Sequence, residues 1–207
     1  MRGRNFAVAG LASLLVSLLA ACASAPVRFH TLDPVAPASP PPAAPALRVP
    51  VRLVSVTLPP ELDRPQIVRR AGPGRLDVAD DDRWAGALDE LARRALAADL
   101  AARLPPGAVV PPDDPAPPRL LHGLDVAIER FEGTTGKGGG LVTLDARWTL
   151  LGGAPGGEVS GQALARHEER IEVPANTSKD GADVDGTVTA MSAALGQLAD
   201  RIAHEIR

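Results

Sequence analysis

Aromatic residues are scarce in this chain of 207 residues: it has no tyrosine, and phenylalanine and tryptophan together make up only 2%. Proteins that bind single-stranded nucleic acids or sugars commonly stack them on aromatic side chains, so this composition argues against such sites. Only two of the 22 basic residues are lysines, and the formal net charge is −3. A mildly acidic chain without a basic run favours neither a nucleic-acid partner nor a polybasic membrane contact.

Cysteine occurs once, at position 22, so the chain cannot form an internal disulfide. The residues before it have the pattern of an export signal. Arg2 and Arg4 provide a positively charged beginning, and residues 6–21 are apolar apart from glycine and serine. This apolar stretch of 16 residues is shorter than the ~20 that span a bilayer comfortably. We therefore expect the segment to be cleaved off.

The sequence Leu19-Ala20-Ala21-Cys22 resembles the bacterial lipobox, at which the lipoprotein signal peptidase cleaves. We predict that the mature protein begins at Cys22, whose thiol accepts a diacylglyceryl group and whose freed amine takes a further acyl chain such as palmitate. Two or more acyl chains anchor a protein stably. Ala23 and Ser24 follow, with no Asp as an inner-membrane retention signal, which favours the periplasmic face of the outer membrane. The alternative is an ordinary secretory signal with an incidental cysteine.

The cleaved chain would have 186 residues, which fits one domain or a small domain on a tether. Its formal net charge would shift from −3 to −5, because the signal holds two arginines and no acidic residue. We predict a signal peptide at 1–21, a lipidated N-terminus with a short strand and a Pro/Ala-rich spacer at 22–46, and a domain at 47–207. Residues 27–32 could also pair with the main sheet, and the Pro-rich stretch would then be a surface loop. The pattern leaves both possibilities open.

The predicted domain contains six candidate strands. The segments with β-branched composition, period-two alternation or a turn-flanked position are residues 48–58, 66–70, 75–78, 120–131, 141–151 and 159–173. The second and third of these flank the turn Gly72-Pro73-Gly74 as a hairpin, and the fourth and fifth form an antiparallel pair. Alternating charges between Arg166 and Glu172 indicate a solvent-facing side of the last strand.

Residues 82–104 and 184–206 have apolar side chains spaced three and four apart, as in amphipathic helices. Asp82 is the predicted N-cap of the first helix, and Pro105-Pro106-Gly107 ends it. The predicted fold class is α+β, with a mainly antiparallel sheet of about six strands packed against two amphipathic helices.

Asp80, Asp81 and Asp82 have two interpretations. Clustered carboxylates bind hard divalent cations, but these three also precede a predicted helix, whose positive N-terminus they would complement. We favour the helix interpretation and predict no metal site.

No catalytic pattern is present in the sequence. The histidines, which are His30, His122, His167 and His204, lack the spacing of a zinc site, and we interpret them as surface or strand residues. Lys137 lies in a glycine-rich loop without the phosphate-binding P-loop frame. There is no G-x-S-x-G elbow and no free cysteine to act as a nucleophile. We predict neither an enzyme nor a bound cofactor.

The run from Leu58 to Val68 is different, because its prolines and a charged pair rigidify a surface turn that leads straight into a strand. In one interpretation it is an ordinary structural turn in which Asp63 and Arg64 bond locally. In the other it is a contact surface. Residue chemistry alone favours the structural turn.

The chain resembles the PqiC (YmbA) family of ABC-type transport auxiliary lipoproteins in three places. These are Phe29-His30-Thr31-Leu32, the run from Val56 to Val68 that ends in Leu62-Asp63-Arg64-Pro65-Gln66-Ile67-Val68, and Asp82-Arg83-Trp84-Ala85. The order of the elements agrees along essentially the whole mature chain, and the second run is the most specific. Two mild departures are Phe29, where the family usually has tyrosine, and Ala87, where proline is common.

The resemblance implies an outer-membrane-anchored subunit of a system with mammalian-cell-entry (MCE) domains, which moves lipids between the two membranes and supports membrane integrity. Such a subunit would dock the distal end of the periplasmic tunnel formed by the MCE-domain protein, as a ring of identical copies, and would not hydrolyse ATP. The implied structural or partner-contact residues are Leu62, Asp63, Arg64, Pro65, Gln66, Arg83 and Trp84.

Two other functions are compatible with the sequence. A lipoprotein scaffold or activator of cell-wall synthesis enzymes would use the Pro-rich stretch from Asp33 to Pro50 as a tether. These 18 residues would reach roughly 55 Å as polyproline, at ~3.1 Å each. Order in residues 29–32 within the main sheet would shorten that reach. A lipid carrier would need a sizeable apolar pocket.

Overall fold

The computed structural model describes residues 26–37, 49–111, 113–115, 120–134, 140–154, 158–178 and 181–206. The predictions for the signal peptide, for Cys22, for the Pro-rich stretch from 38 to 48 and for Lys137 fall outside the described residues.

Three long antiparallel strands form one side of the sheet, with β8 at its edge: β6 (His122–Thr134), β7 (Gly140–Gly153) and β8 (Val159–Ala175). The predicted antiparallel pair and the strand that follows it are thereby confirmed. Alternate residues of β7 are buried against the helices, among them Leu144 and Trp148. On the opposite face charges alternate between strands, and Arg147 forms ion pairs with Glu129 at 2.6 Å and with Glu168 at 3.1 Å.

The remaining strands join the sheet through β6, on the side away from β7, and make it mixed. β2 (Val51–Thr57) runs parallel to β6 and to β5 (Val109–Val110), while β3 (Gln66–Gly72) and β4 (Arg75–Trp84) form the predicted hairpin. β3 also runs parallel to the end of β6, and β1 (Arg28–His30) runs parallel to β4. The α+β class is confirmed, but four of the strand pairs among the described residues are parallel. Period-two patterns show which face is buried and not which strand lies alongside.

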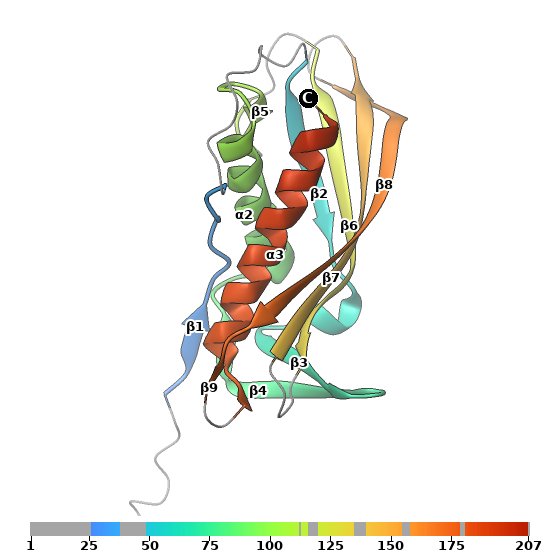
Figure 1. Cartoon of the computed structure of the whole chain (residues 1–207). Coiled ribbons are helices and arrows are strands. Elements are labelled where there is room, and N and C mark those ends of the chain that lie inside the picture. Colours follow the sequence, from blue (N-terminus) through green and yellow to red (C-terminus); the bar gives the residue numbers. More distant parts are fainter. Residues whose placement is uncertain are drawn as a thin grey trace, which may run out of the picture.

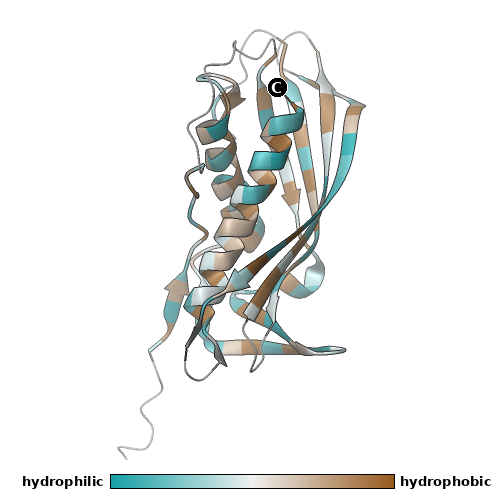
Figure 2. Ribbon diagram, in the orientation of Figure 1, coloured by the Kyte–Doolittle hydropathy of each residue, from teal (hydrophilic) through white to brown (hydrophobic). Residues whose placement is uncertain are grey.

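Two helices, α2 (Leu88–Arg103) and α3 (Val184–Glu205), cover one face of the sheet side by side (Figure 1). Their apolar stripes and the inner faces of the strands enclose one continuous core, whereas hydrophilic residues lie along β8 and the last turns of α3 (Figure 2). A short 3₁₀ helix, η2 (Pro60–Leu62), follows β2, and a small ladder of β9 (Thr177–Ser178) with β10 (Gly181–Ala182) precedes α3.

The first predicted helix begins six residues too early. Residues 82–84 belong to β4, and α2 starts at Leu88 with Ala87 at the N-cap. The prediction that the three aspartates complement this helix is wrong for the same reason. Pairing of β4 with β3 on one side and β1 on the other extends the strand through Trp84, and no short-range pattern announces those partners. Among the described residues no group of three metal-binding side chains is found.

Residues 31–37, here called the strap, continue from β1 along the outer side of the two helices (Figure 1). The backbone nitrogen of Asp33 donates to the Ser192 hydroxyl of α3 at 3.2 Å, and that of Val35 donates to the Asp99 carboxylate of α2 at 2.7 Å. A Cβ at Gly196 would lie 3.1 Å from that of Val35, so glycine there allows the close approach.

The position of the strap determines what the Pro-rich stretch connects. The stretch lies between the strap and β2, and both of these pack on the same domain. The link between Cys22 and β1 is therefore only the five residues 23–27.

Asp99 is fully buried where the strap meets α2, and Arg103 lies beside it at 3.2 Å. Arg103 also donates to the Val35 carbonyl at 2.9 Å and to Asp200 of α3 at 2.6 Å. Burial raises the pKa of Asp99 to about 6, although the hydrogen bond from Val35 and the charge of Arg103 act in the opposite direction.

This raised pKa predicts a pH dependence of stability. The folded protein binds the Asp99 proton more tightly than the unfolded chain, whose aspartates titrate near ~3.9. Lowering the pH from 7 to 5 should therefore stabilise the fold through this group by about 1 kcal/mol. In Asp99→Asn this gain in the free energy of unfolding between pH 7 and pH 5 should be missing, as measured by urea unfolding at both pH values. The exposed Asp89→Asn on the same helix is the control, and an Asp99→Asn variant with the wild-type pH difference would contradict the prediction.

Candidate functional site

The turn between β2 and β3 contains the most distinctive sequence run and is held by backbone hydrogen bonds. Leu62 donates to Pro59 at 3.0 Å, Asp63 to Pro60 at 3.2 Å and Arg64 to Leu62 at 2.8 Å. The prolines restrict the backbone further, because their rings fix φ. Among the described residues, the side chains of Asp63 and Arg64 form no hydrogen bond with each other. The backbone bonds and the prolines therefore account for the rigidity of the turn.

Burial divides the predicted motif into two groups. Leu62 and Trp84 are buried in the core, where they hold the turn against the sheet. Trp84 also donates its backbone N–H to the carbonyl of Pro65 at 2.7 Å, which links β4 to the turn. The second group, Asp63 to Pro65, is exposed, and Gln66 and Arg83 are half-buried. The buried pair is structural, and the exposed residues form a surface available to a partner.

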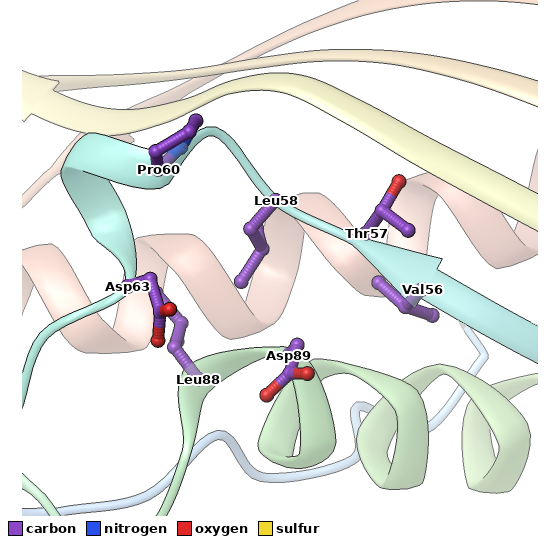
Figure 3. Close-up of a pocket in the computed structure, with 7 residues that line it drawn as sticks. All are labelled: Val56, Thr57, Leu58, Pro60, Asp63, Leu88 and Asp89. Atoms are coloured by element: carbon purple, nitrogen blue, oxygen red, sulfur yellow. The ribbon is translucent and has the colours of Figure 1, made fainter.

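Two open hollows flank the turn where it faces the start of α2, and each has a volume of about 300 Å³. The first is lined by Val56, Thr57, Leu58, Pro60, Asp63, Leu88 and Asp89. Figure 3 shows Leu58 pointing from the end of β2 toward α2, with Asp63 and Asp89 at the side of the turn and of the helix. The second is lined by residues 63–65 and 84–88, so both share Asp63 and Leu88.

The chemistry of these hollows suits a protein surface better than a lipid. The two carboxylates, Asp63 and Asp89, line the first hollow, and burying a charge against an acyl chain is costly. Leu58 and Leu88 provide a small apolar floor between them. Side chains of a docking partner can fill such shallow, mixed surfaces.

β1 is attached next to this turn by a buried carboxylate. Asp82 of β4 accepts a hydrogen bond from Arg28 at 2.8 Å and lies 2.7 Å from His30 Nε2. His30 Nδ1 lies 3.5 Å from Asp185 on the first turn of α3. Burial alone would raise the pKa of Asp82, but the hydrogen bonds from Arg28 and His30 outweigh it and hold the pKa below its usual range.

This cluster was not predicted from the sequence, because it joins residues more than fifty positions apart. His30 was interpreted as a surface or strand residue and is indeed in a strand, but it contributes to the attachment of β1. The register pairs His30 with Trp84, and Ala85 donates to the His30 carbonyl at 2.8 Å. The strand nearest to the predicted anchor and the motif turn therefore lie at the same part of the sheet.

Comparison with known protein families identifies the family of the chain. The sequence model of the family described as "ABC-type transport auxiliary lipoprotein component" matches residues 30–203. The chain belongs to this family. The family resemblance seen in the sequence is confirmed, and the family's lipoprotein character agrees with a lipobox that precedes the matched region.

Two solved structures have a similar fold along most of the chain. A crystal structure titled as an uncharacterised protein has a TM-score of 0.67 at 20% identity and covers 88% of this chain and 100% of its own. A DUF330 protein from Xanthomonas campestris has a TM-score of 0.66 at 18% identity, with coverage of 86% and 93%. These likenesses show the fold. None of the curated proteins compared with the chain matches it, and no described helix is long and apolar enough to cross a membrane.

The Asp82 cluster generates a second prediction. Asp82→Asn removes the negative charge that Arg28 and His30 share, and we expect the free energy of unfolding to fall by about 1–3 kcal/mol at pH 7. Because the folded pKa is lowered, the contribution of Asp82 is present above the unfolded pKa of ~3.9 and is lost only in stronger acid. Amide hydrogen exchange at residues 29–32 should also accelerate. The exposed neighbour Asp81→Asn should change neither measurement, and unchanged exchange in Asp82→Asn would count against the attachment.

Proposed function

We propose that this chain is the outer-membrane-anchored subunit of an MCE-type ABC system for lipid transport between the two membranes, where it docks the periplasmic tunnel component. The carrying observation is the division of the motif turn into a buried, rigid base and an exposed Asp63-Arg64-Pro65 surface, in a family described as auxiliary to ABC-type transport. Within this proposal the chain is a docking subunit and not an enzyme.

The short link to the anchor supports a role close to the membrane. Six residue steps separate Cys22 from Arg28, and an extended chain covers at most ~3.6 Å per step, or roughly 20 Å in total. β1 in turn lies beside β4 and the motif turn. A tunnel that delivers or collects lipids must end near the membrane, and a docking surface held within this distance meets that requirement.

The rigidity of the turn supports a role in recognition. A surface that is already ordered loses little conformational entropy when a partner binds. Arg64 and Asp63 provide opposite charges next to the two hollows, so a partner with complementary charges could be oriented there. A closed ring of identical subunits, as the resemblance implies, would present one such turn per copy around the end of a tunnel.

The alternative function, a scaffold or activator of cell-wall synthesis enzymes, depended on a long reach from the membrane. With β1 in the sheet, the link from Cys22 has five residues in place of the 18-residue tether. That alternative loses its main support.

Lipidation at Cys22 can be tested by fractionation. The intact protein should sediment with outer membranes in a density gradient, whereas Cys22→Ser, exported behind an ordinary secretory signal peptide that does not need the lipobox, should appear in the soluble periplasmic fraction. Its thermal unfolding should be unchanged, because Cys22 precedes every described element. Membrane association that survives the substitution would refute the anchor, and sedimentation of the intact protein with inner membranes would refute the outer-membrane placement.

Docking can be tested with a photo-crosslinking amino acid at position 64, in the Cys22-intact protein in cells. We expect the probe to recover an MCE-domain protein, identified by mass spectrometry. A matched probe at Gln162, an exposed residue of β8 far along the sheet from the turn, should not. Failure of the first probe to recover an MCE-domain protein, or equal recovery by both, would contradict the proposal. Crosslinks between copies would report on the ring.

A further inference from the structure

Phe29 is exposed in a protein with very few aromatic side chains. After signal-peptide cleavage the chain retains two phenylalanines, of which Phe131 is fully buried and Phe29 is 68% exposed. Val27, just before β1, is 41% exposed. Single exposed apolar residues are common, but these two lie within three positions of each other on the shortest route to the predicted anchor. Val27 and Phe29 are five and seven positions after Cys22, close to the predicted lipid anchor.

The attachment of β1 orients Phe29 outward. Arg28 and His30 both turn toward Asp82 and the start of α3. Because side chains alternate along a strand, Phe29 between them points to the opposite face. The β1–β4 register places Arg83 beside it.

Arg83 is the polar counterpart of this exposed face. Its side chain is half-buried and forms no ion pair among the described residues, and its Nε, which is itself buried, has no hydrogen-bond partner there. An apolar ring next to an arginine without a carboxylate partner is the combination that suits a phospholipid interface, where the ring meets acyl chains and the guanidinium meets phosphate.

The length of the link places this face at the membrane. Seven residue steps separate Cys22 from Phe29, so the two are at most roughly 25 Å apart at ~3.6 Å per residue. Val27 is two steps closer. The headgroup region adds roughly 5–8 Å to each side of the hydrocarbon core. An anchored Cys22 therefore keeps Phe29 at high local concentration next to lipid.

We propose that Val27, Phe29 and Arg83 form a lipid-contact surface, on which Phe29 inserts into the headgroup boundary of the membrane that holds the acyl chains of Cys22. This inference rests on the lipid anchor of the proposed function and adds an orientation: the β1 end of the domain lies against the bilayer, and the C-terminal end of α3 points away (Figure 1). The three-residue β1 is too short an edge to favour strand addition by a second copy.

The test uses the absence of any other cysteine. In the lipidated protein the Cys22 thiol is consumed, so a Phe29→Cys variant has a single free thiol for an environment-sensitive fluorophore. Leu164→Cys is the matched control, because Leu164 is also an exposed apolar strand residue, at 49%, in the part of β8 remote from β1 (Figure 1). Both labelled lipoproteins are reconstituted in vesicles of phosphatidylethanolamine and phosphatidylglycerol, and thermal unfolding confirms that both are folded.

At position 29 we expect a blue-shifted emission, protection from iodide in the aqueous phase, and quenching by lipids brominated near the headgroup. At position 164 the emission should match that of free solution, with iodide quenching and no bromolipid quenching. Protection from iodide at position 29 without bromolipid quenching would mean that another copy covers Phe29, and this would overturn the proposal. So would identical behaviour at both positions in protein that floats with the vesicles. Protein that fails to float would refute the anchor itself, which separates the two failures.

Discussion

The hydrogen-bonded cluster of Arg28 and His30 around Asp82 is the interaction on which the orientation of the molecule depends. It binds β1, the strand nearest to the predicted anchor, to the edge of a hairpin that begins almost forty residues later. Without it the link from the predicted anchor would extend to the next attachment point. With it, only five residues separate Cys22 from β1, and the motif turn lies beside the strand nearest to the predicted anchor.

Two buried carboxylates hold β1 and the strap, together called the N-terminal arm, and their environments differ. Asp82 has two partners that favour its charged form, and its pKa is lowered. Asp99 is more deeply buried and has one oxygen without a hydrogen-bond partner, and burial raises its pKa despite the opposing effects of the Val35 N–H and of Arg103. Buried ion pairs seldom add net stability over apolar packing. Their evident role here is to specify one path for an arm that has little apolar surface of its own.

The local patterns of the sequence predict much of this fold. The helix at 184–206, the hairpin around Gly72-Pro73-Gly74 and the antiparallel strands from 120 to 173 follow from periodicity and turn residues, and the structure contains all of them. The predicted start of α2 was wrong because three consecutive aspartates are compatible both with a helix N-terminus and with the end of a strand. The parallel pairing of β2 with β6 has no local signature, since α2 and β5 lie between them in the chain.

The sequence by itself predicted the export signal and the lipobox and indicated the family, because these depend on residues that are adjacent in the chain. It also indicated the seven motif residues, but not that Leu62 and Trp84 are buried while Asp63 to Pro65 face solvent. Only the tertiary structure decided that division, the attachment of β1 through Asp82 and the outward position of Phe29. Each of these follows from contacts between segments tens of residues apart, and such contacts leave no periodic trace in either segment.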